Sequence, residues 1–255
     1  MTTTRLIEVF SAIQGEGLNV GTRQLFIRFA LCDLRCHFCD SAHTWSVPSQ
    51  CRIERSPGTR DFEMYDNPVS LELLLHCVQQ LNVPGLHDSI SLTGGEPLLH
   101  SAFLLEFLPQ LQSTGLPIYL ETGGHRPQQL AMVLPYINSV GMDLKLPSAS
   151  GESHWQEHAK FLQLCHQADV EVFVKVIVSA ETSVAELHQA AELVADVSPE
   201  IPLFLQPVTP LTTPHSQTAF STPTPAQVLA WQTEMKHQLK QVRVVPQTHK
   251  MLNQL

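Results

Sequence analysis

Three cysteines lie close together near the start of the chain, at Cys32, Cys36 and Cys39. Thiolates at this spacing can share one metal centre only if the chain forms a tight loop between them. A ferredoxin-type iron–sulfur cluster takes four thiolates, and a structural zinc site also takes four ligands, usually in two separated pairs. Three cysteines therefore indicate a cubane iron–sulfur cluster whose fourth iron is open to another ligand. The alternative is a zinc site in which His37 or His43 is the fourth ligand.

The length and charge of the chain exclude several classes of protein. Its 255 residues are enough to bury the core of one α/β domain, so we expect a single domain over residues 1–255. Lys and Arg total only 15 against 24 Asp and Glu, which argues against a nucleic-acid partner. No apolar run could cross a membrane, and residues 1–8 contain no apolar signal segment, so a cytoplasmic location is expected. In that reducing compartment the six cysteines are expected to be ligands or free thiols.

Strand-like segments alternate with helical patterns along most of the chain. Strands are expected at 25–31, 89–93, 118–121, 140–143, 172–178, 203–206 and 242–245. Helices are expected near 70–82, 101–113, 127–135, 154–168, 183–196 and 224–240. This alternation predicts an α/β fold with a parallel sheet, either open or rolled into a partial barrel. The site of such folds lies at the carboxyl ends of the strands.

Local signals define two helix starts and two breaks in this pattern. Ser183 to Glu186 has the spacing of a capping box, and Thr224 with Pro225 marks another helix start. Residues 46–68 are polar and contain proline, which predicts an irregular insert. Residues 207–223 are rich in proline and threonine, which predicts a long loop, either near the site or as a surface excursion.

Several expected strands end in residues that can bind a small molecule. The turn at 93–97 reads Thr-Gly-Gly-Glu-Pro, and its glycines let a ligand approach the backbone closely. Glu121 can accept hydrogen bonds from a ribose or an ammonium group, or it can simply cap a turn. Lys145 can pair with a carboxylate, and the alternative is an ordinary surface charge. Lys175 alternates with apolar residues in a later strand and either points into the barrel or snorkels to the surface.

The segment before the cysteines also has the features of a binding site. Gln14 to Gly17 reads Gln-Gly-Glu-Gly, whose exposed backbone can hydrogen-bond a flat heterocycle; the alternative is a plain tight turn. Arg28 offers a guanidinium fork that suits a carboxylate, or it forms an ordinary salt bridge on an edge strand.

The cysteine loop together with the Gly-Gly-Glu-Pro turn resembles the radical S-adenosylmethionine (SAM) superfamily. The segments at 10–17, 39–45 and 242–249 further resemble the 7-carboxy-7-deazaguanine synthase family, from Ile13 to His249. The resemblance implies an incomplete TIM-type barrel of parallel strands with outer helices, the radical SAM fold. No motif of the family matches residues 46–68, and no role is carried over to them.

The resemblance implies a carbon–nitrogen lyase that converts 6-carboxy-5,6,7,8-tetrahydropterin to 7-carboxy-7-deazaguanine with loss of ammonia, on the route to queuosine and other 7-deazapurines. One electron from a reduced cluster would cleave SAM to a 5′-deoxyadenosyl radical. That radical would take a hydrogen atom from C6 of the pterin and later recover it, so that SAM is regenerated. The implied partners are an electron donor such as flavodoxin or ferredoxin and a second copy of the chain in a homodimer.

The resemblance also assigns residues to each ligand. The 4Fe–4S cluster would be held by Cys32, Cys36 and Cys39, and Mg²⁺ by the hydroxyl of Ser41. SAM would be contacted by Phe38, Cys39, Asp40, Gly95, Glu121, Asp143, Leu144 and Lys145. The position of Gln206 at a strand end adds it to this set, near the adenine. The pterin would be contacted by Ile13, Gln14, Gly15, Arg28 and Thr93.

Two rival functions stay open from the sequence. An activating enzyme that makes a glycyl radical on a partner protein would share the cysteine loop, the Gly-Gly turn and the Asp143-x-Lys145 motif, but it would not need the small-molecule turn at Gln14 to Gly17. A zinc-binding regulatory module is the second rival, and metal analysis for zinc, iron and sulfide distinguishes it.

Overall fold

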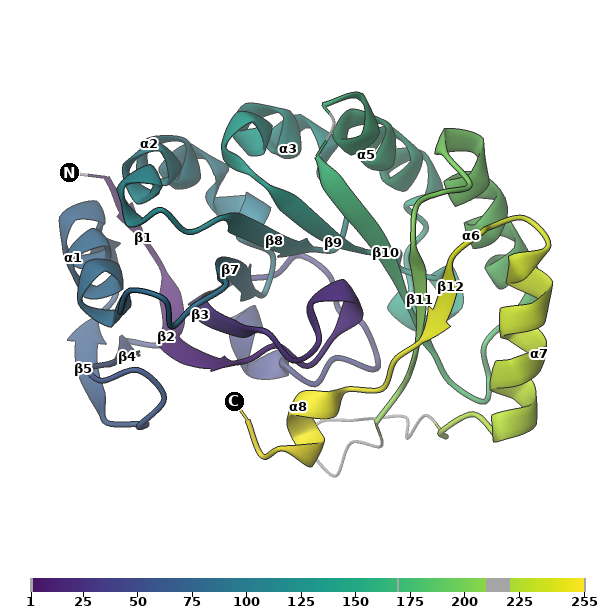
Figure 1. Cartoon of the computed structure of the whole chain (residues 1–255), viewed down its shortest axis with the longest axis horizontal. Helices are drawn as coiled ribbons and strands as arrows, with labels where there is room; N and C mark the ends of the chain where they lie inside the picture. Colours follow the sequence, from purple (N-terminus) through teal and green to yellow (C-terminus); the bar gives the residue numbers. More distant parts are fainter. Residues whose placement is uncertain (1, 169, 210–220, 255) are drawn as a thin grey trace.

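Ten strands form one curved sheet in the computed structural model, which describes residues 2–168, 170–209 and 221–254 (Figure 1). Neighbouring strands follow the order β12-β11-β10-β9-β8-β7-β3-β2-β4-β5, and every pairing from β3 to β12 is parallel. These parallel strands are β3 (Arg23–Phe29), β7 (Ser89–Gly94), β8 (Ile118–Thr122), β9 (Ser139–Asp143), β10 (Glu171–Val178), β11 (Leu203–Pro207) and β12 (Val242–Val244). Among the described residues nothing pairs the two edge strands, so the barrel is open, as expected.

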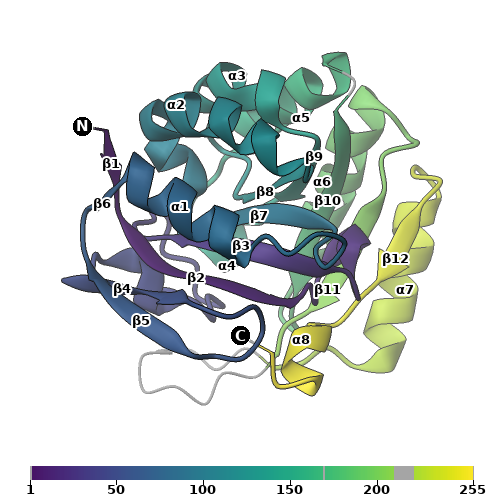
Figure 2. The same ribbon diagram turned by 60° about the vertical axis from the view of Figure 1, so that its left-hand side comes forward.

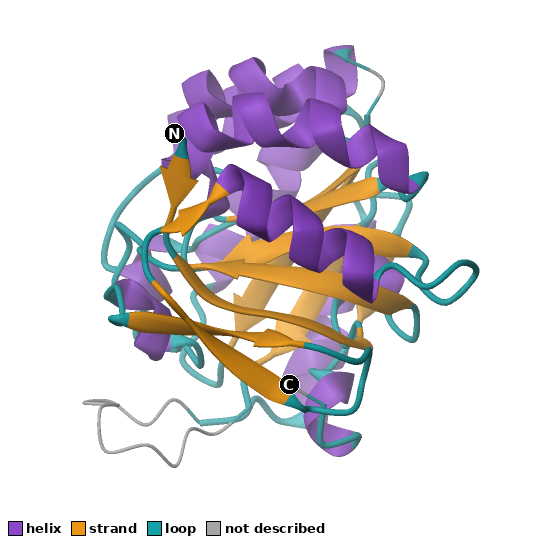
Figure 3. Ribbon diagram, turned by 90° about the vertical axis from the view of Figure 1, so that its left-hand side faces the viewer, coloured by secondary structure: helices purple, strands orange, loops and turns teal. Residues whose placement is uncertain are grey.

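Helices cover the outer, convex side of the sheet (Figures 1 and 3). They are α1 (Leu71–Leu81), α2 (Ser101–Leu111), α3 (Pro127–Val133), α5 (Trp155–Gln167), α6 (Val184–Val197) and α7 (Pro225–Lys236). A short helix, α4 (Pro147–Ser150), follows β9. The sequence produces these layers because the central strands alternate: their outward-facing side chains are apolar and pack beneath the helices, and their inner face carries aromatic and polar side chains.

Strand β10 shows how one segment serves two faces. Its even-numbered valines, Val172, Val174, Val176 and Val178, belong to the large core beneath the helices. Phe173 points to the inside of the barrel, where it stacks on Tyr119 and packs edge-on against Phe204. The period of two along a strand therefore places Lys175 and Ile177 on the inner face too, and both line the pocket.

The expected strands and helices are confirmed, with ends that differ by a few residues. A further strand, β2 (Leu6–Ile13), pairs antiparallel with β3 and was not predicted. The capping box at Thr224 is present, with Gln227 completing it. The box expected at Ser183 is absent, because Glu186 instead accepts hydrogen bonds from the backbone and hydroxyl of Ser148.

The prediction of an irregular insert at 46–68 is wrong. The segment contains β4 (Gln50–Glu54) and β5 (Phe62–Asp66), which extend the sheet beyond β2 (Figure 2). The physical reason lies outside the segment: β4 finds a parallel partner in β2, with Arg52 opposite Glu8. Its end is fixed by buried Glu54, which accepts hydrogen bonds from the backbone N–H groups of residues 11, 58 and 60.

The three cysteines outside the cysteine loop are buried. Cys77 in α1 and Cys165 in α5 belong to the core, and Cys51 is buried in β4. Of the loop expected at 207–223, residues 210–220 lie outside the described part of the chain. No helix within the described residues is both long and apolar enough to cross a bilayer.

Candidate active site

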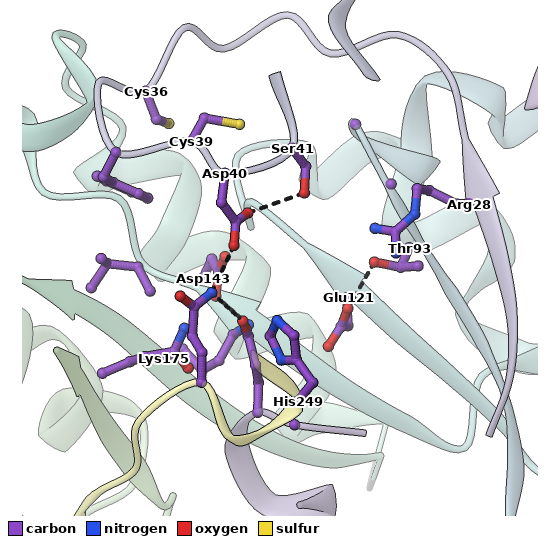
Figure 4. A pocket seen from close by; sticks show the side chains of 18 of the residues that line it. Arg28, Cys36, Cys39, Asp40, Ser41, Thr93, Glu121, Asp143, Lys175 and His249 are labelled. Carbon is purple, nitrogen blue, oxygen red and sulfur yellow. Dashed lines mark hydrogen bonds and ion pairs between the residues drawn. The ribbon is translucent and has the colours of Figure 1, made fainter. Parts of the chain in front are cut away.

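A cavity of about 470 Å³ lies at the carboxyl ends of the parallel strands, inside the curve of the sheet. It brings together every residue expected to bind cluster, SAM, pterin or Mg²⁺ except Leu144. The side chain of Leu144 is buried in the hydrophobic core instead. Figure 4 shows Cys36 and Cys39 on one side of the cavity, Arg28, Thr93 and Glu121 on the other, and Asp143, Lys175 and His249 below them.

The cysteine loop leaves β3 and places all three thiols on the cavity wall. Burial raises the pKa of both Cys32 and Cys39 to about 11 and also raises the pKa of Cys36. Buried thiols of this kind become thiolates only when a cation compensates their charge, as iron does. No three His, Cys, Asp or Glu side chains in the described ranges are placed to share one metal ion. A cubane cluster does not require that, because each cysteine binds a different iron.

The Gly94–Gly95 turn packs directly against the segment that leads into the cysteine loop. Gly95 N donates to Phe29 O at 3.1 Å, and Glu96 N donates to Leu31 O at 2.8 Å. Glycine is required here, because a Cβ on Gly95 would lie 2.0 Å from Leu31 O. The sequence of this turn therefore fixes the position of the cysteine loop relative to β7.

Substituting Gly95 by alanine should destabilise the protein by about 3 kcal/mol, the upper end of the usual cost of overpacking. Gly115→Ala is the control, because Gly115 has a φ of +71° but open space around its missing Cβ. That variant should lose only the cost of a left-handed backbone, about 1 kcal/mol. Chemical denaturation measures both. Equal losses would show that the turn and the cysteine loop are not in tight contact.

Glu121 is the centre of a hydrogen-bond cluster at the end of β8. Thr93 Oγ1 donates to it at 2.7 Å, and Gln14 Nε2 and the hydroxyl of Tyr119 donate at 3.1 Å each. Burial and the nearby carboxylate raise the pKa of Tyr119 well above its usual value, so the phenol stays a donor. Two residues expected to contact the pterin, Gln14 and Thr93, are thus held by one expected to contact SAM.

Arg28 lies on the inner face of β3 and pairs with buried Glu8. Its Nε lies 2.8 Å from Glu8 Oε1, and its guanidinium lies 5.4 Å from the centre of the Phe10 ring. Arg52 from β4 takes the other oxygen of Glu8 at 2.5 Å and stacks over Phe62. Because two arginines share one carboxylate, the group formed by Arg28, Arg52 and Glu8 carries one net positive charge and is suited to an anion.

A row of alternating charges crosses the floor of the cavity. Lys145 Nζ lies 2.8 Å from one oxygen of Asp143 and 5.3 Å from the centre of the Phe38 ring. Lys175 Nζ lies 3.1 Å from the other oxygen of Asp143 and pairs with Glu16. Lys145 and Lys175 hold the pKa of Asp143 below its usual value even though burial opposes this. Both ammonium groups and both carboxylates are therefore charged.

The C-terminal helix α8 (Thr248–Met251) and Gln247 just before it line the cavity with side chains to which no role was assigned from sequence. Lys250 pairs with Asp40 at 2.8 Å, and Gln247 Nε2 donates to both Asp40 and Glu16. His249 packs so tightly on Gly15 that a Cβ there would lie 2.3 Å from its ring. The sequence signal was the motif at 242–249, which identified the segment but not its contacts.

Buried His158 supports the backbone beside the cavity, because its Nε2 lies 3.0 Å from Gly123 O. Burial lowers its pKa from 6.5 to about 3, so it is neutral in the folded protein. An unfolded chain would bind a proton at this residue below pH 6.5, so the stabilisation is complete above that pH and declines as the pH falls toward 3. Between pH 7.5 and pH 5 the expected loss is about 2 kcal/mol.

Chemical denaturation at pH 7.5 and pH 5 tests this linkage. The variant His158→Gln removes the titrating ring and keeps an N–H donor, so its stability should fall about 2 kcal/mol less over that interval. His188→Gln, on the exposed side of α6, should behave like the parent protein. The same pH dependence in all three would show that His158 does not control it.

Comparison with known proteins gives three kinds of match. The family model of the radical SAM superfamily matches residues 26–194. A 7-carboxy-7-deazaguanine synthase of Geobacter sulfurreducens is 44% identical over 254 residues, 98% of this chain and 97% of that protein. One of Thermococcus kodakarensis is 34% identical over 217 residues, 81% and 84% of the two chains.

Solved structures match in fold. The crystal structure of QueE from Escherichia coli covers 97% of this chain and 95% of its own, with a TM-score of 0.61 and 22% identity. Streptococcus suis SuiB bound to S-adenosylmethionine covers 87% of this chain and 51% of its own, with a TM-score of 0.59 and 11% identity. At these identities the likeness establishes the fold alone.

Proposed function

This chain belongs to the radical SAM superfamily and, within it, to the 7-carboxy-7-deazaguanine synthases, and from this premise we propose that its cavity binds SAM and 6-carboxy-5,6,7,8-tetrahydropterin side by side. The observation that carries the proposal is the cavity itself. Several parts of the chain that are distant in sequence line one space. They are the three cysteines, the Gly-Gly turn, Lys145, and the wall that contains Gln14 and Arg28. The proposed reaction is the ring contraction of that pterin with loss of ammonia.

The cysteine side of the cavity suits a 4Fe–4S cluster with one open iron. Cys32, Cys36 and Cys39 would hold it, since their buried thiols need a compensating cation. When bound, the cluster and SAM supply the one-electron chemistry, and the protein supplies position and exclusion of side reactions. A flavodoxin or ferredoxin as electron donor and a homodimeric assembly complete the proposal, supported by the family resemblance.

The residues around the floor suit SAM. The ammonium of Lys145 would pair with its carboxylate, and the backbone of Gly95 would approach its amino group. Glu121 and Asp143 offer carboxylate acceptors, and Phe38 and Asp40 line the same wall. Leu144 can contribute only backbone atoms, because its side chain is in the core. Gln206 has a buried Oε1 without a hydrogen-bond partner among the described residues, which suits a donor such as an adenine amino group.

The opposite wall suits a flat, carboxylated heterocycle. Gln14 and Thr93 carry groups that can read the edge of a pterin, and Ile13 and Gly15 let it approach the backbone. Within the described residues, Arg28 donates a hydrogen bond to Glu8 through its Nε alone. Its two terminal nitrogens are therefore available to bind a carboxylate. The net positive charge of the two arginines favours an anionic substrate on this side.

Mg²⁺ would be bound through the hydroxyl of Ser41, and one hydroxyl is a sparse protein site. Magnesium keeps most of its waters and takes ligands from substrates, which makes such a site workable. Ser41→Ala should raise the Mg²⁺ concentration for half-maximal rate by about tenfold or more, since even the loss of a hydrogen-bond partner of a metal ligand costs about tenfold in affinity. Ser49→Ala, an exposed serine outside the cavity, is the control. An unchanged Mg²⁺ dependence in Ser41→Ala would contradict the site.

An anaerobic turnover assay tests the function. The cluster is reconstituted, dithionite, SAM, Mg²⁺ and 6-carboxytetrahydropterin are added, and the products are followed by mass spectrometry. We expect 7-carboxy-7-deazaguanine, with most of the SAM conserved. Cleavage of SAM without that product would keep the radical chemistry and reject the substrate.

A further inference from the structure

Lys175 is a buried cation that none of the assignments above uses. Its side chain is only 4% exposed, and it lies in the middle of a strand with apolar residues on either side of it. Burial alone would favour the neutral amine, and it is the surrounding acids that keep the pKa of Lys175 well above its usual value. Its ammonium offsets the charge of the partly buried carboxylates of Glu16 and Asp143, which an apolar side chain could not do.

The ammonium of Lys175 joins two parts of the cavity that are far apart in sequence. Glu16 belongs to the turn between β2 and β3, on the side proposed for the pterin. Asp143 ends β9, on the side proposed for SAM, and forms an ion pair with Lys175 at 3.1 Å. Figure 4 shows Lys175 beneath Asp143, at the floor of the cavity.

Each of these two carboxylate residues, Asp143 and Glu16, makes further contacts. The second oxygen of Asp143 lies 2.8 Å from Lys145, which is proposed to pair with SAM. Glu16 accepts from Gln247 at 2.8 Å, and its backbone N donates to Gln14 Oε1 at 3.0 Å. Without Lys175 the two acids would repel each other across the cavity floor, since the pKa of Glu16 is below its usual value only because Lys175 outweighs burial and the charges of Asp40 and Asp143.

We propose that Lys175 is a positioning residue whose ammonium ties the Gln14–Gly17 turn to the end of β9, so that the two ligands bind cooperatively. The proposal rests on the function proposed above for its pterin and SAM sides. If the first ligand orders the residues joined by this tie, the second ligand loses less conformational entropy when it binds. The second ligand therefore binds more tightly, which is positive coupling. Coupling is reciprocal, so each ligand should raise the affinity of the other by the same factor.

The tie itself can be tested without either ligand. In Lys175→Met, which keeps an unbranched side chain one atom shorter and removes the charge, amide hydrogen exchange should become several-fold faster at residues 14–17 and 143–146. Lys175→Arg keeps the charge and should restore part of the protection. Lys160→Met, an exposed lysine on α5, should leave exchange unchanged in both segments. Unchanged exchange in Lys175→Met would overturn the proposal, whatever the enzyme is found to catalyse.

The coupling is measured by equilibrium dialysis of SAM on the reconstituted protein, without reductant, in the presence and absence of 6-carboxytetrahydropterin. In the parent the pterin should tighten SAM binding by about fivefold or more, and in Lys175→Met the ratio should fall to near one. Weaker binding of both ligands with the ratio preserved would make Lys175 merely structural and overturn the proposal.

If Lys175→Met does not fold, Glu16→Gln breaks one arm of the tie and keeps the size of the side chain. Its coupling ratio should fall in the same way, while exchange should rise only at residues 14–17. A parent protein that fails to convert the pterin would instead reject the proposed function, and the ligand-free exchange experiment would still decide whether the tie exists.

Discussion

Cys36→Ala should abolish cluster binding and turnover. Cys36 is one of three thiols on the cavity wall among the described residues, and it is just 7% exposed. Two thiolates cannot fix a cubane that already lacks a fourth protein ligand. Even the loss of a partner of a metal ligand costs up to about 100-fold in metal affinity or activity, so the loss of a ligand should exceed this. Iron and sulfide analysis, the visible absorption of the cluster and product formation measure the effect.

The chain offers a matched control for this substitution. Cys77 is as buried as Cys36, at 3% exposed, but it lies in α1 beneath the sheet and away from the cavity. Cys77→Ala should cost about 1 kcal/mol of stability, a typical value for a core substitution. It should retain cluster and activity. A Cys36→Ala protein with full activity would remove the basis for the cluster assignment.

The order of strands and helices was predictable because it depends on local patterns. Apolar runs and helix caps are written into neighbouring residues, and carboxyl ends of parallel strands meet at one edge of a sheet. This is enough to bring Cys32, Thr93, Glu121 and Asp143 to one cavity. Leu144 also lies at the end of a strand, as expected. Its side chain, however, follows the alternation of β9 into the core and does not reach the cavity.

What the sequence did not predict depends on contacts between distant segments. Strand β4 forms because β2 provides its hydrogen-bond partner. Residues 46–68 taken alone therefore do not predict a strand. The sharing of Glu8 by Arg28 and Arg52 follows from that pairing. Likewise, the contact of Lys250 with Asp40 depends on where the chain returns after β12. Such pairs have no pattern in the sequence, because neither residue constrains the other until the fold exists.

Arg28→Ala should weaken pterin binding far more than SAM binding. Hydrogen bonds to a charged partner contribute about 1.5–3 kcal/mol, which corresponds to about a 10- to 100-fold rise in the KM for the pterin. SAM affinity should change little, because Arg28 pairs with Glu8 and packs on Phe10, away from Lys145 and Asp143. Arg28→Lys keeps the charge but loses the fork, so an intermediate effect is expected.

Arg23→Ala separates this effect from a loss of strand packing. Arg23 lies on the same strand, but its guanidinium bonds Ser11 Oγ and Pro57 O and does not line the cavity. Its removal should lower stability without changing the KM for the pterin. Removal of Arg28 also leaves Glu8 with Arg52 alone. Only a structural role would weaken both ligands equally, and that result would show that the Arg28–Glu8 pair supports the strand and does not bind substrate.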